Sequence, residues 1–245
     1  MATLSRYLCA LLLGLILSTS SYAEQASPAA DSTFTSLFAT PADKLALQQL
    51  AEQLSSGDTA QGQFTQYRYL TVLQRPLVSH GEFVFQSDLG LAWVQLRPFA
   101  STLVLSQDTL VQIDSDGRRQ VNRADDNPQA QALAHTIPLL MSALLRGDIA
   151  PLSQQFSLHL IQEASGWQLG LIPKDPMLAQ ALPKMVMQGQ TQIKSLTLLN
   201  SNGDRSLIEF EQISEQPLSP QQRALFGTDN FATDNDADNR PDARR

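Results

Sequence analysis

The chain has 245 residues, of which 42% are hydrophobic and 17% charged, and it carries a formal net charge of −7 at pH 7. Its Lys and Arg residues are scattered and form no basic stripe, which argues against a nucleic-acid partner and against electrostatic docking on anionic lipid headgroups. The only cysteine is Cys9, so a disulfide within the chain is excluded.

The first 23 residues have the three regions of a secretory signal peptide. Arg6 supplies the positive charge, residues 8–17 form an apolar run, and Ser21 and Ala23 place small side chains at positions −3 and −1 of a cleavage site. An uncleaved anchor is the alternative, although the apolar run is short for a membrane span. Cleavage would remove Arg6 and Cys9 and leave 24 acidic against 16 basic residues, a net charge of −8. Export without disulfides suits a bacterial periplasm.

The next segment, residues 24–39, is rich in Ala, Ser and Thr and is expected to form a linker. A helix is predicted over 41–55, with Thr40 as N-cap, Pro41 in the first turn and leucines at helical spacing up to Gly57. Beyond Gly57 the period of the apolar residues changes to two, as in β-strands. Strands are predicted over 62–70, 80–86, 90–96, 101–106, 109–113 and 118–122.

A helical segment is predicted over 126–148, between two groups of strands. Its apolar residues fall on one stripe, and Pro138 must break the hydrogen-bond ladder, so the segment forms two short helices or one kinked helix. Strands are then predicted over 155–162, 167–173, 184–189, 193–199 and 205–213. Residues 216–245 are expected to form a disordered acidic tail, because the chain beyond Gly227 is polar and rich in Asp and Asn.

The short turns between these strands predict an antiparallel meander, and eleven strands in one sheet tend to curl. The predicted fold class is therefore α+β, mainly β: a curved, incomplete antiparallel β-barrel over residues 40–215, with the helical segment as a lid over an apolar cavity. Strand 90–96 is apolar on both faces, since Leu91 and Trp93 alternate with Ala92 and Val94. A solvent-facing side would be polar, so the second face also needs a cover, and the helical segment is the candidate.

Several short motifs follow one another in an order that is typical of one family. A strand with Phe64 and Gln66 precedes a Gly-acid-apolar strand that starts at Gly81, and a strand with Trp93 comes next. Pro98, a hairpin with Leu103, Val104 and Leu110, and the segment LGLIPKD (169–175) complete the set. Over roughly residues 41–213, the chain resembles the bacterial outer-membrane lipoprotein carrier proteins, the LolA-like family.

This resemblance implies a monomeric periplasmic carrier without enzymatic activity, cofactor or metal. Its cargo would be an acylated lipoprotein or a lipid, received from an inner-membrane transporter and delivered to an outer-membrane acceptor. The chain departs from the family at one place. Where the family has an arginine followed by proline that helps to hold the lid, this chain has Ser87, and Arg97-Pro98 lies after the Trp strand instead. The lid latch of the family is therefore not supported here.

The residues expected to line the acyl-binding cavity come from the alternating strands and from the stripe of the helical segment. They are Phe83, Phe85, Leu91, Trp93, Leu103 and Leu105 from the strands, and Ile137, Leu140, Met141 and Leu144 from the helical segment. Each has a second interpretation as ordinary core, because an apolar stripe is common in both settings.

Catalysis is not indicated by the sequence. His80, His135 and His159 are isolated and lack metal-binding spacing, and no G-x-S-x-G elbow is present. Two functions from different classes remain open: a periplasmic carrier that shields acyl chains, and a lipid- or lipoprotein-sensing or partner-binding module on the same fold, without transfer activity. A solid β-core with a purely structural role is a third alternative.

Overall fold

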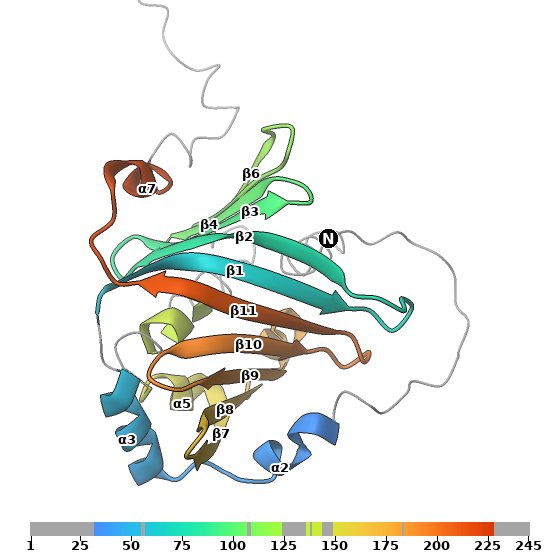
Figure 1. Cartoon of the computed structure of the whole chain (residues 1–245), viewed down its shortest axis with the longest axis vertical. Coiled ribbons are helices and arrows are strands. Elements are labelled where there is room, and N and C mark those ends of the chain that lie inside the picture. The colour runs from blue at the N-terminus through green and yellow to red at the C-terminus, as the bar shows by residue number, and fades with distance from the viewer. Residues whose placement is uncertain are drawn as a thin grey trace, which may run out of the picture.

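The computed structural model describes residues 32–54, 57–106, 109–123, 136–137, 139–143, 149–182 and 184–227. Within these residues, eleven strands form one antiparallel sheet in the order β6-β5-β4-β3-β2-β1-β11-β10-β9-β8-β7 (Figure 1). No helix in this part of the chain has both the length and the apolar character of a membrane span. The predicted signal peptide and the chain beyond Gly227 lie outside the described residues.

Two meanders of consecutive strands make up the sheet. The first contains β1 (Thr59–Tyr69), β2 (Leu77–Gln86), β3 (Gly90–Arg97), β4 (Ser101–Ser106), β5 (Thr109–Ile113) and β6 (Arg119–Arg123). The second contains β7 (Phe156–Glu163), β8 (Gly166–Pro173), β9 (Lys184–Gly189), β10 (Ile193–Leu199) and β11 (Arg205–Ser214). Pairing of β1 with β11 joins them, while β6 and β7 form the two edges. All eleven predicted strands are present, with bounds that differ by no more than three residues.

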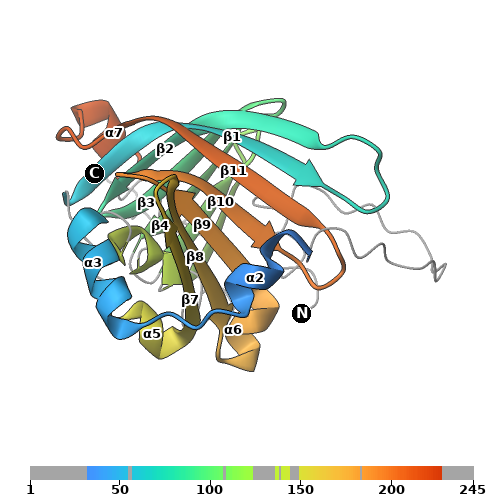
Figure 2. The same ribbon diagram turned by 60° about the horizontal axis from the view of Figure 1, so that its bottom comes forward.

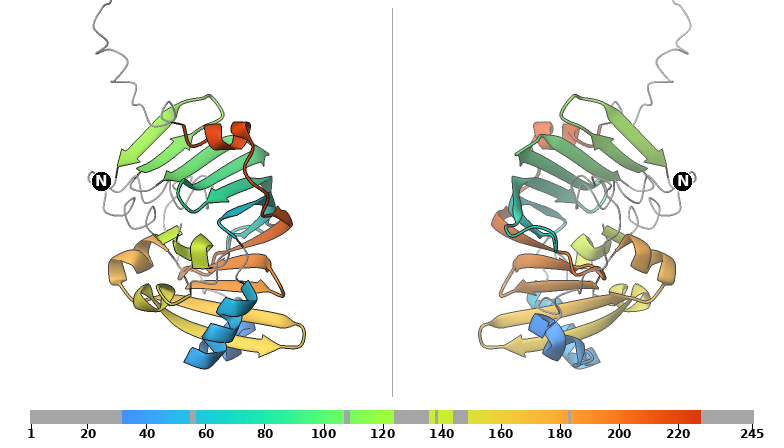
Figure 3. Two further views of the ribbon diagram at one scale, coloured as in Figure 1. Left: turned by 90° about the vertical axis from the view of Figure 1, so that its left-hand side faces the viewer. Right: turned by 90° about the vertical axis from the view of Figure 1, so that its right-hand side faces the viewer.

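The sheet curves strongly without closing, so that it has a concave and a convex face (Figure 3). Helical residues 136–137 and 139–143, drawn in yellow-green, lie on the concave side between the two halves of the sheet. The predicted fold, a curved and incomplete antiparallel barrel with a helical segment on its concave side, is therefore confirmed.

The first long helix, α3 (Lys44–Leu54), packs beside the second meander (Figure 2). Its predicted stripe is confirmed, because Leu47, Leu50 and Leu54 all contact the core there. The predicted N-cap was wrong. Asp43 occupies this role, since its carboxylate accepts a hydrogen bond from the Leu45 N–H at 3.1 Å. Thr40 and Pro41 precede the helix, and Pro41 pairs with His159 of β7.

Apolar side chains on the concave face form two contiguous clusters. The first-half cluster comprises Ala60, Phe64, Phe83, Phe85, Leu91, Trp93, Leu103, Leu105, Leu110 and Ile208. The second-half cluster is built mainly of Leu and Met from β7–β10, with Leu50 and Leu54 of α3 and Leu140 and Ala143 of the helical segment. The helical segment thus bridges both halves of the concave face.

The convex face of the first meander is covered by the C-terminal segment 216–227, which explains why strand 90–96 is apolar on both sides. Val84, Ala92, Val104 and Val111 form a row across β2–β5 and pack against Leu218 and Phe226. Between these two residues lies α7 (Pro220–Ala224), which was predicted as part of a disordered tail. Ser219 caps α7: its hydroxyl accepts from the Gln222 N–H, and the Gln222 side chain accepts from the Ser219 N–H. The described helical residues, 136–137 and 139–143, lie on the opposite, concave face.

The convex face of the second meander is covered by η1 (Ser32–Phe34) and α2 (Thr35–Phe38), within the predicted linker. Leu37 is fully buried and packs with Phe34, Val186 and Leu199. Two short helices, α5 (Leu152–Gln155) and α6 (Pro176–Ala181), complete the described elements.

Candidate functional site

The six strand residues predicted to line a cavity lie together on the concave face. Strand register aligns them in two rows, Phe83–Trp93–Leu103 and Phe85–Leu91–Leu105, across β2, β3 and β4. All six belong to the first-half cluster, and each is at least nine-tenths buried. Their common facing follows from alternation, because residues two apart on a strand point to the same side of a sheet.

The helical residues divide between the two halves of this face. Ile137 and Met141 are half-buried and pack on the first-half cluster, while Leu140 is buried in the second-half cluster. Ile137 also contacts the second-half cluster. Leu144, the fourth predicted lid residue, lies outside the described residues. Nine of the ten predicted site residues are therefore described, and all nine pack in the two apolar clusters where the sheet and the described helical residues face each other.

Four aromatic rings meet at the centre of the first-half cluster. Phe64 stacks on Trp93 with ring centroids 3.7 Å apart, and Phe210 meets Phe83 and Trp93 edge-on at 5.4 and 6.4 Å. Phe64 and Phe210 were not among the predicted site residues. Alternation within β1 and β11 was the signal that could have identified them.

The indole N–H of Trp93 is a buried donor. Trp93 is 7% exposed, and its Nε1 has no hydrogen-bond partner among the described residues. The other tryptophan differs, because Trp167 Nε1 donates to the carbonyl oxygen of Gln190 at 2.7 Å. Burying an unpaired donor typically costs about 1–3 kcal/mol, so Trp93 offers an unused hydrogen bond to a carbonyl oxygen on this face.

Polar side chains interrupt the concave face near the hairpin that connects β1 and β2. Gln66 and Arg68 follow Phe64 on the same face of β1, and register aligns Arg68 with Ser206 of β11. Gln66 is 1% exposed, Arg68 is 7% exposed and Ser206 is buried as well. The concave face is therefore apolar over the two clusters and becomes polar beside the β1–β2 hairpin, where Gln66 and Arg68 lie near the end of β1.

Ser87, where the resemblance predicts a latch arginine, lies exposed in the turn between β2 and β3. Its N–H donates to the carbonyl oxygen of Asp58 at 3.0 Å, which is a turn contact and not a contact with the helical segment. Arg97-Pro98 lies at the opposite end of β3, exposed to solvent. The buried arginine that the described concave face does carry is Arg68.

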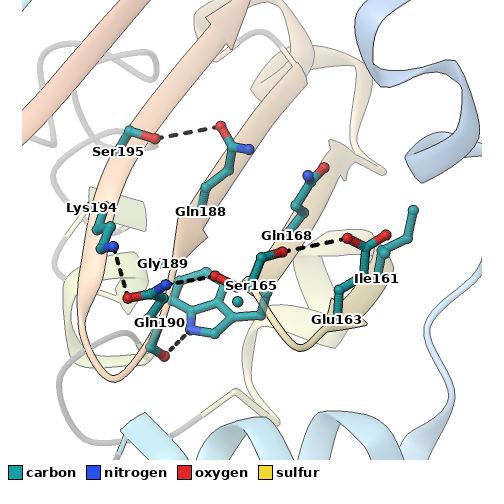
Figure 4. Close-up of a pocket in the computed structure, with 11 residues that line it drawn as sticks. Ile161, Glu163, Ser165, Gln168, Gln188, Gly189, Gln190, Lys194 and Ser195 are labelled. Atoms are coloured by element: carbon teal, nitrogen blue, oxygen red, sulfur yellow. Dashed lines mark hydrogen bonds between the residues drawn. The ribbon is translucent and has the colours of Figure 1, made fainter.

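A separate pocket of about 230 Å³ lies in the second meander, beside the β7–β8 and β9–β10 turns (Figure 4). It contains none of the predicted site residues. Its polar groups bond to one another: Lys194 Nζ donates to the Gln190 side chain at 2.8 Å, and the Gln190 side-chain amide donates to the backbone carbonyl oxygen of Ser165 at 2.7 Å. We therefore place the candidate site on the concave face.

The described histidines lie apart from each other on the convex side. His80 Nδ1 is 3.1 Å from the hydroxyl of Thr65, and His159 meets Phe38 of α2 edge-on at 5.7 Å. His135 lies outside the described residues. The two rings therefore do not share one site.

Comparison with known structures returned several similar folds. The LolA superfamily protein NE2245 of Nitrosomonas europaea aligns with a TM-score of 0.43 and 9% identity, over 77% of this chain and 99% of that one. A chain of the Pseudomonas aeruginosa MucA/MucB complex aligns with a TM-score of 0.41 and 17% identity, over 72% and 60%. A DUF1329 family protein of Desulfovibrio piger aligns with a TM-score of 0.42 and 11% identity, over 77% and 98%.

Comparison of the sequence with curated proteins returned no match. The model of the family described as outer membrane lipoprotein carrier protein LolA matches residues 55–225, which is more than half of the chain. This range contains every strand of the sheet and the helical segment on its concave side. The chain therefore belongs to the LolA family of outer membrane lipoprotein carrier proteins.

Proposed function

We propose that the protein is a periplasmic carrier that shields the acyl chains of lipoproteins or lipids during transfer from the inner to the outer membrane. The observation that carries this proposal is the apolar lining of the concave face, which continues from the sheet onto helical residues 137 and 139–141. Membership of the LolA family supports the same assignment.

The physical need for such a carrier follows from the cost of exposing acyl chains to water. At about 0.8 kcal/mol per methylene, one chain of ~16 carbons costs roughly 12 kcal/mol, and three chains cost on the order of 35 kcal/mol. Spontaneous transfer across an aqueous compartment would be very slow. An apolar face that closes around the chains removes most of this cost.

In this proposal, the six strand residues and the four helical residues form the wall that the acyl chains contact. Movement of the helical segment away from the sheet would open the space between them. Met141 suits this role, because its flexible thioether side chain adapts to cargo of different shapes. Trp93 would donate its unused N–H to an ester or amide carbonyl of the cargo, and Gln66 and Arg68 would lie against its polar end.

A second function, sensing of lipids or binding of a protein partner without transfer, is favoured by one observation. The described side chains of the concave face pack closely on one another, as the Phe64–Trp93 stack shows. A closed face of this kind suits a module that binds a partner and stays closed. The carrier, in contrast, must open. It would act as a monomer that receives its cargo from an inner-membrane transporter and releases it to an outer-membrane acceptor.

Native mass spectrometry of protein purified gently from the periplasm, followed by solvent extraction, tests the proposal. A bound mass that resolves to a lipid or an acylated protein is the expected result and identifies the cargo. Stoichiometric binding of a non-acylated protein would favour the second function. A mass of the protein alone, together with no uptake of a fluorescent fatty acid, would contradict the carrier assignment.

A further inference from the structure

Exposed large apolar side chains gather at one end of the sheet. The described residues include seven such side chains, and six of them lie in the β1–β2 hairpin or next to the β3–β4 turn. These six are Val72, Leu73, Leu77, Val78, Leu96 and Phe99, and we call them the apolar end. The seventh is Leu45 on α3. Single exposed apolar residues are normal on a soluble protein, whereas a group of six in two neighbouring loops and the strand ends beside them indicates an interaction surface.

The two loops are neighbours because β2 pairs with β3. Register aligns His80 of β2 with Arg97 of β3, so Leu77 and Val78 run alongside the turn that contains Phe99. The β1–β2 hairpin projects beyond the rest of the sheet (Figures 1 and 2). Val72 is 85% exposed and Phe99 is 74% exposed, so the most accessible apolar side chains belong to the loops themselves.

The charge of the apolar end is opposite to that of the whole chain. Arg75 and Arg97 are exposed within it, and residues 70–80 and 95–102 contain no Asp or Glu, although the chain has a net charge of −7. Asp204 reaches the base of the hairpin, where it accepts a hydrogen bond from the Thr71 N–H at 2.8 Å. The guanidinium carbon of its neighbour Arg205 lies 4.2 Å from the centroid of the Tyr69 ring, and the positive charge of Arg205 offsets the negative charge of Asp204.

We propose that the apolar end docks on the surface of an anionic phospholipid bilayer. Leu73, Val72 and Phe99 would enter the boundary between headgroups and acyl chains, while Arg75 and Arg97 would contact lipid phosphates. Apolar loop tips flanked by arginines fit a bilayer, because insertion needs no complementary shape. The arginines that are scattered along the sequence are thus brought together with the apolar tips by the strand pairing. This inference goes beyond the carrier function and does not depend on the cargo site.

Flotation of the mature protein with lipid vesicles tests the proposal. The protein is expected to float with vesicles of phosphatidylethanolamine and phosphatidylglycerol, to float less with phosphatidylcholine alone, and to dissociate as salt is raised. The double variant Leu73→Ser, Phe99→Ser should bind the anionic vesicles about tenfold or more weakly. The variant Arg75→Gln, Arg97→Gln should lose most of the salt dependence.

Leu45→Ser is the matched control, since Leu45 is a comparably exposed leucine far from the apolar end in sequence, and it should bind vesicles like the wild type. All substituted side chains are exposed, and a thermal unfolding curve checks that each variant folds. Wild-type protein that does not float with anionic vesicles would overturn the proposal. So would equal binding by the Leu73→Ser, Phe99→Ser variant, or self-association in solution that this variant abolishes. Bound cargo, measured separately by native mass spectrometry, reports on the carrier function and not on docking.

Discussion

The ring of Phe64 stacks on the indole of Trp93 at 3.7 Å, although the two residues lie on β1 and β3, which are separated by β2. The stack crosses the intervening strand at Gly81, the register partner of Phe64. A Cβ atom built on Gly81 would lie 2.5 Å from Phe64 Cζ and would also collide with the carbonyl oxygen of Val94. A residue without a side chain is therefore what lets the two rings meet.

Gly81→Ala should consequently destabilise the protein. Neither the Val94 carbonyl on β3 nor the packed Phe64 ring can move freely, so the added methyl group overpacks the first-half cluster. We expect a loss of about 1–3 kcal/mol in the free energy of unfolding, measured by urea denaturation. Gly57→Ala is the control, because a Cβ atom there meets its nearest neighbour at 3.8 Å. Equal stability of the two variants would show that the stack is not held in this way.

Trp93 should report on cargo through its fluorescence. The chain has two tryptophans, so Trp167→Phe leaves Trp93 as the sole indole emitter. If acyl chains occupy the concave face beside Trp93, a fatty acid brominated along its chain should quench most of this emission, and the unbrominated acid should not. In Trp93→Phe, emission from Trp167 should be quenched less, because Trp167 lies in the second-half cluster on β8, with five strands between it and β3, and its indole is held at the end of the second meander by Gln190. Unquenched Trp93 in the presence of bound fatty acid would exclude this site.

The C-terminal segment should stabilise the sheet. Phe226 is 9% exposed and packs with Leu218 on the convex row of β2–β5. Phe226→Ala should lower the free energy of unfolding by about 3 kcal/mol, the low end for a buried phenylalanine. Loss of the cap in Ser219→Ala should cost about 1 kcal/mol. Gln221→Ala, at an exposed position of α7, should change little, and a Phe226→Ala variant as stable as this control would mean that the segment does not stabilise the sheet.

Helix α2 should anchor the N-terminal segment on the opposite half of the convex face. Leu37 is fully buried against Val186 and Leu199, and α2 lies so close to β8 that a Cβ atom on Gly170 would lie 2.9 Å from Phe38. Leu37→Ala should cost about 2–5 kcal/mol, measured by chemical denaturation. The exposed Ser36 provides the control, since Ser36→Ala removes no buried contact. A loss smaller than about 1 kcal/mol for Leu37→Ala would indicate that the segment packs only loosely.

The strands were predictable from sequence because the turns between them contain the residues that turns require. The segment Asn200–Asp204 separates β10 from β11, and its backbone closes with a hydrogen bond from the Gly203 N–H to the Asn200 carbonyl oxygen. Gly117, in the β5–β6 turn, has a φ of +78°, which favours glycine. Alternation then assigned the six strand residues of the proposed site to a common face.

The segments outside the sheet were harder to predict, because composition hides short packed elements. The sequence Ser219-Pro220-Gln221-Gln222 is a capping box with proline at the first helical position, yet it stands next to a polar tail. The contact between Phe210 and the other rings depends on the register of β1 with β11, in which Phe64 pairs with Phe210. Alternation within one strand does not specify a partner so distant in the chain. Whether the assembled face holds acyl chains stays a prediction.

The order of the strands has a consequence for folding during synthesis. Each meander is built from neighbouring strands, but the central pair of the sheet joins β1, which is synthesised first, to β11, which is synthesised last. Until β11 is complete, β1 is an unpaired edge, and the first-half cluster lacks Ile208 and its contact with Phe210. The core therefore cannot assemble in two independent steps. We expect the nascent chain to need protection from aggregation until its last strand is available.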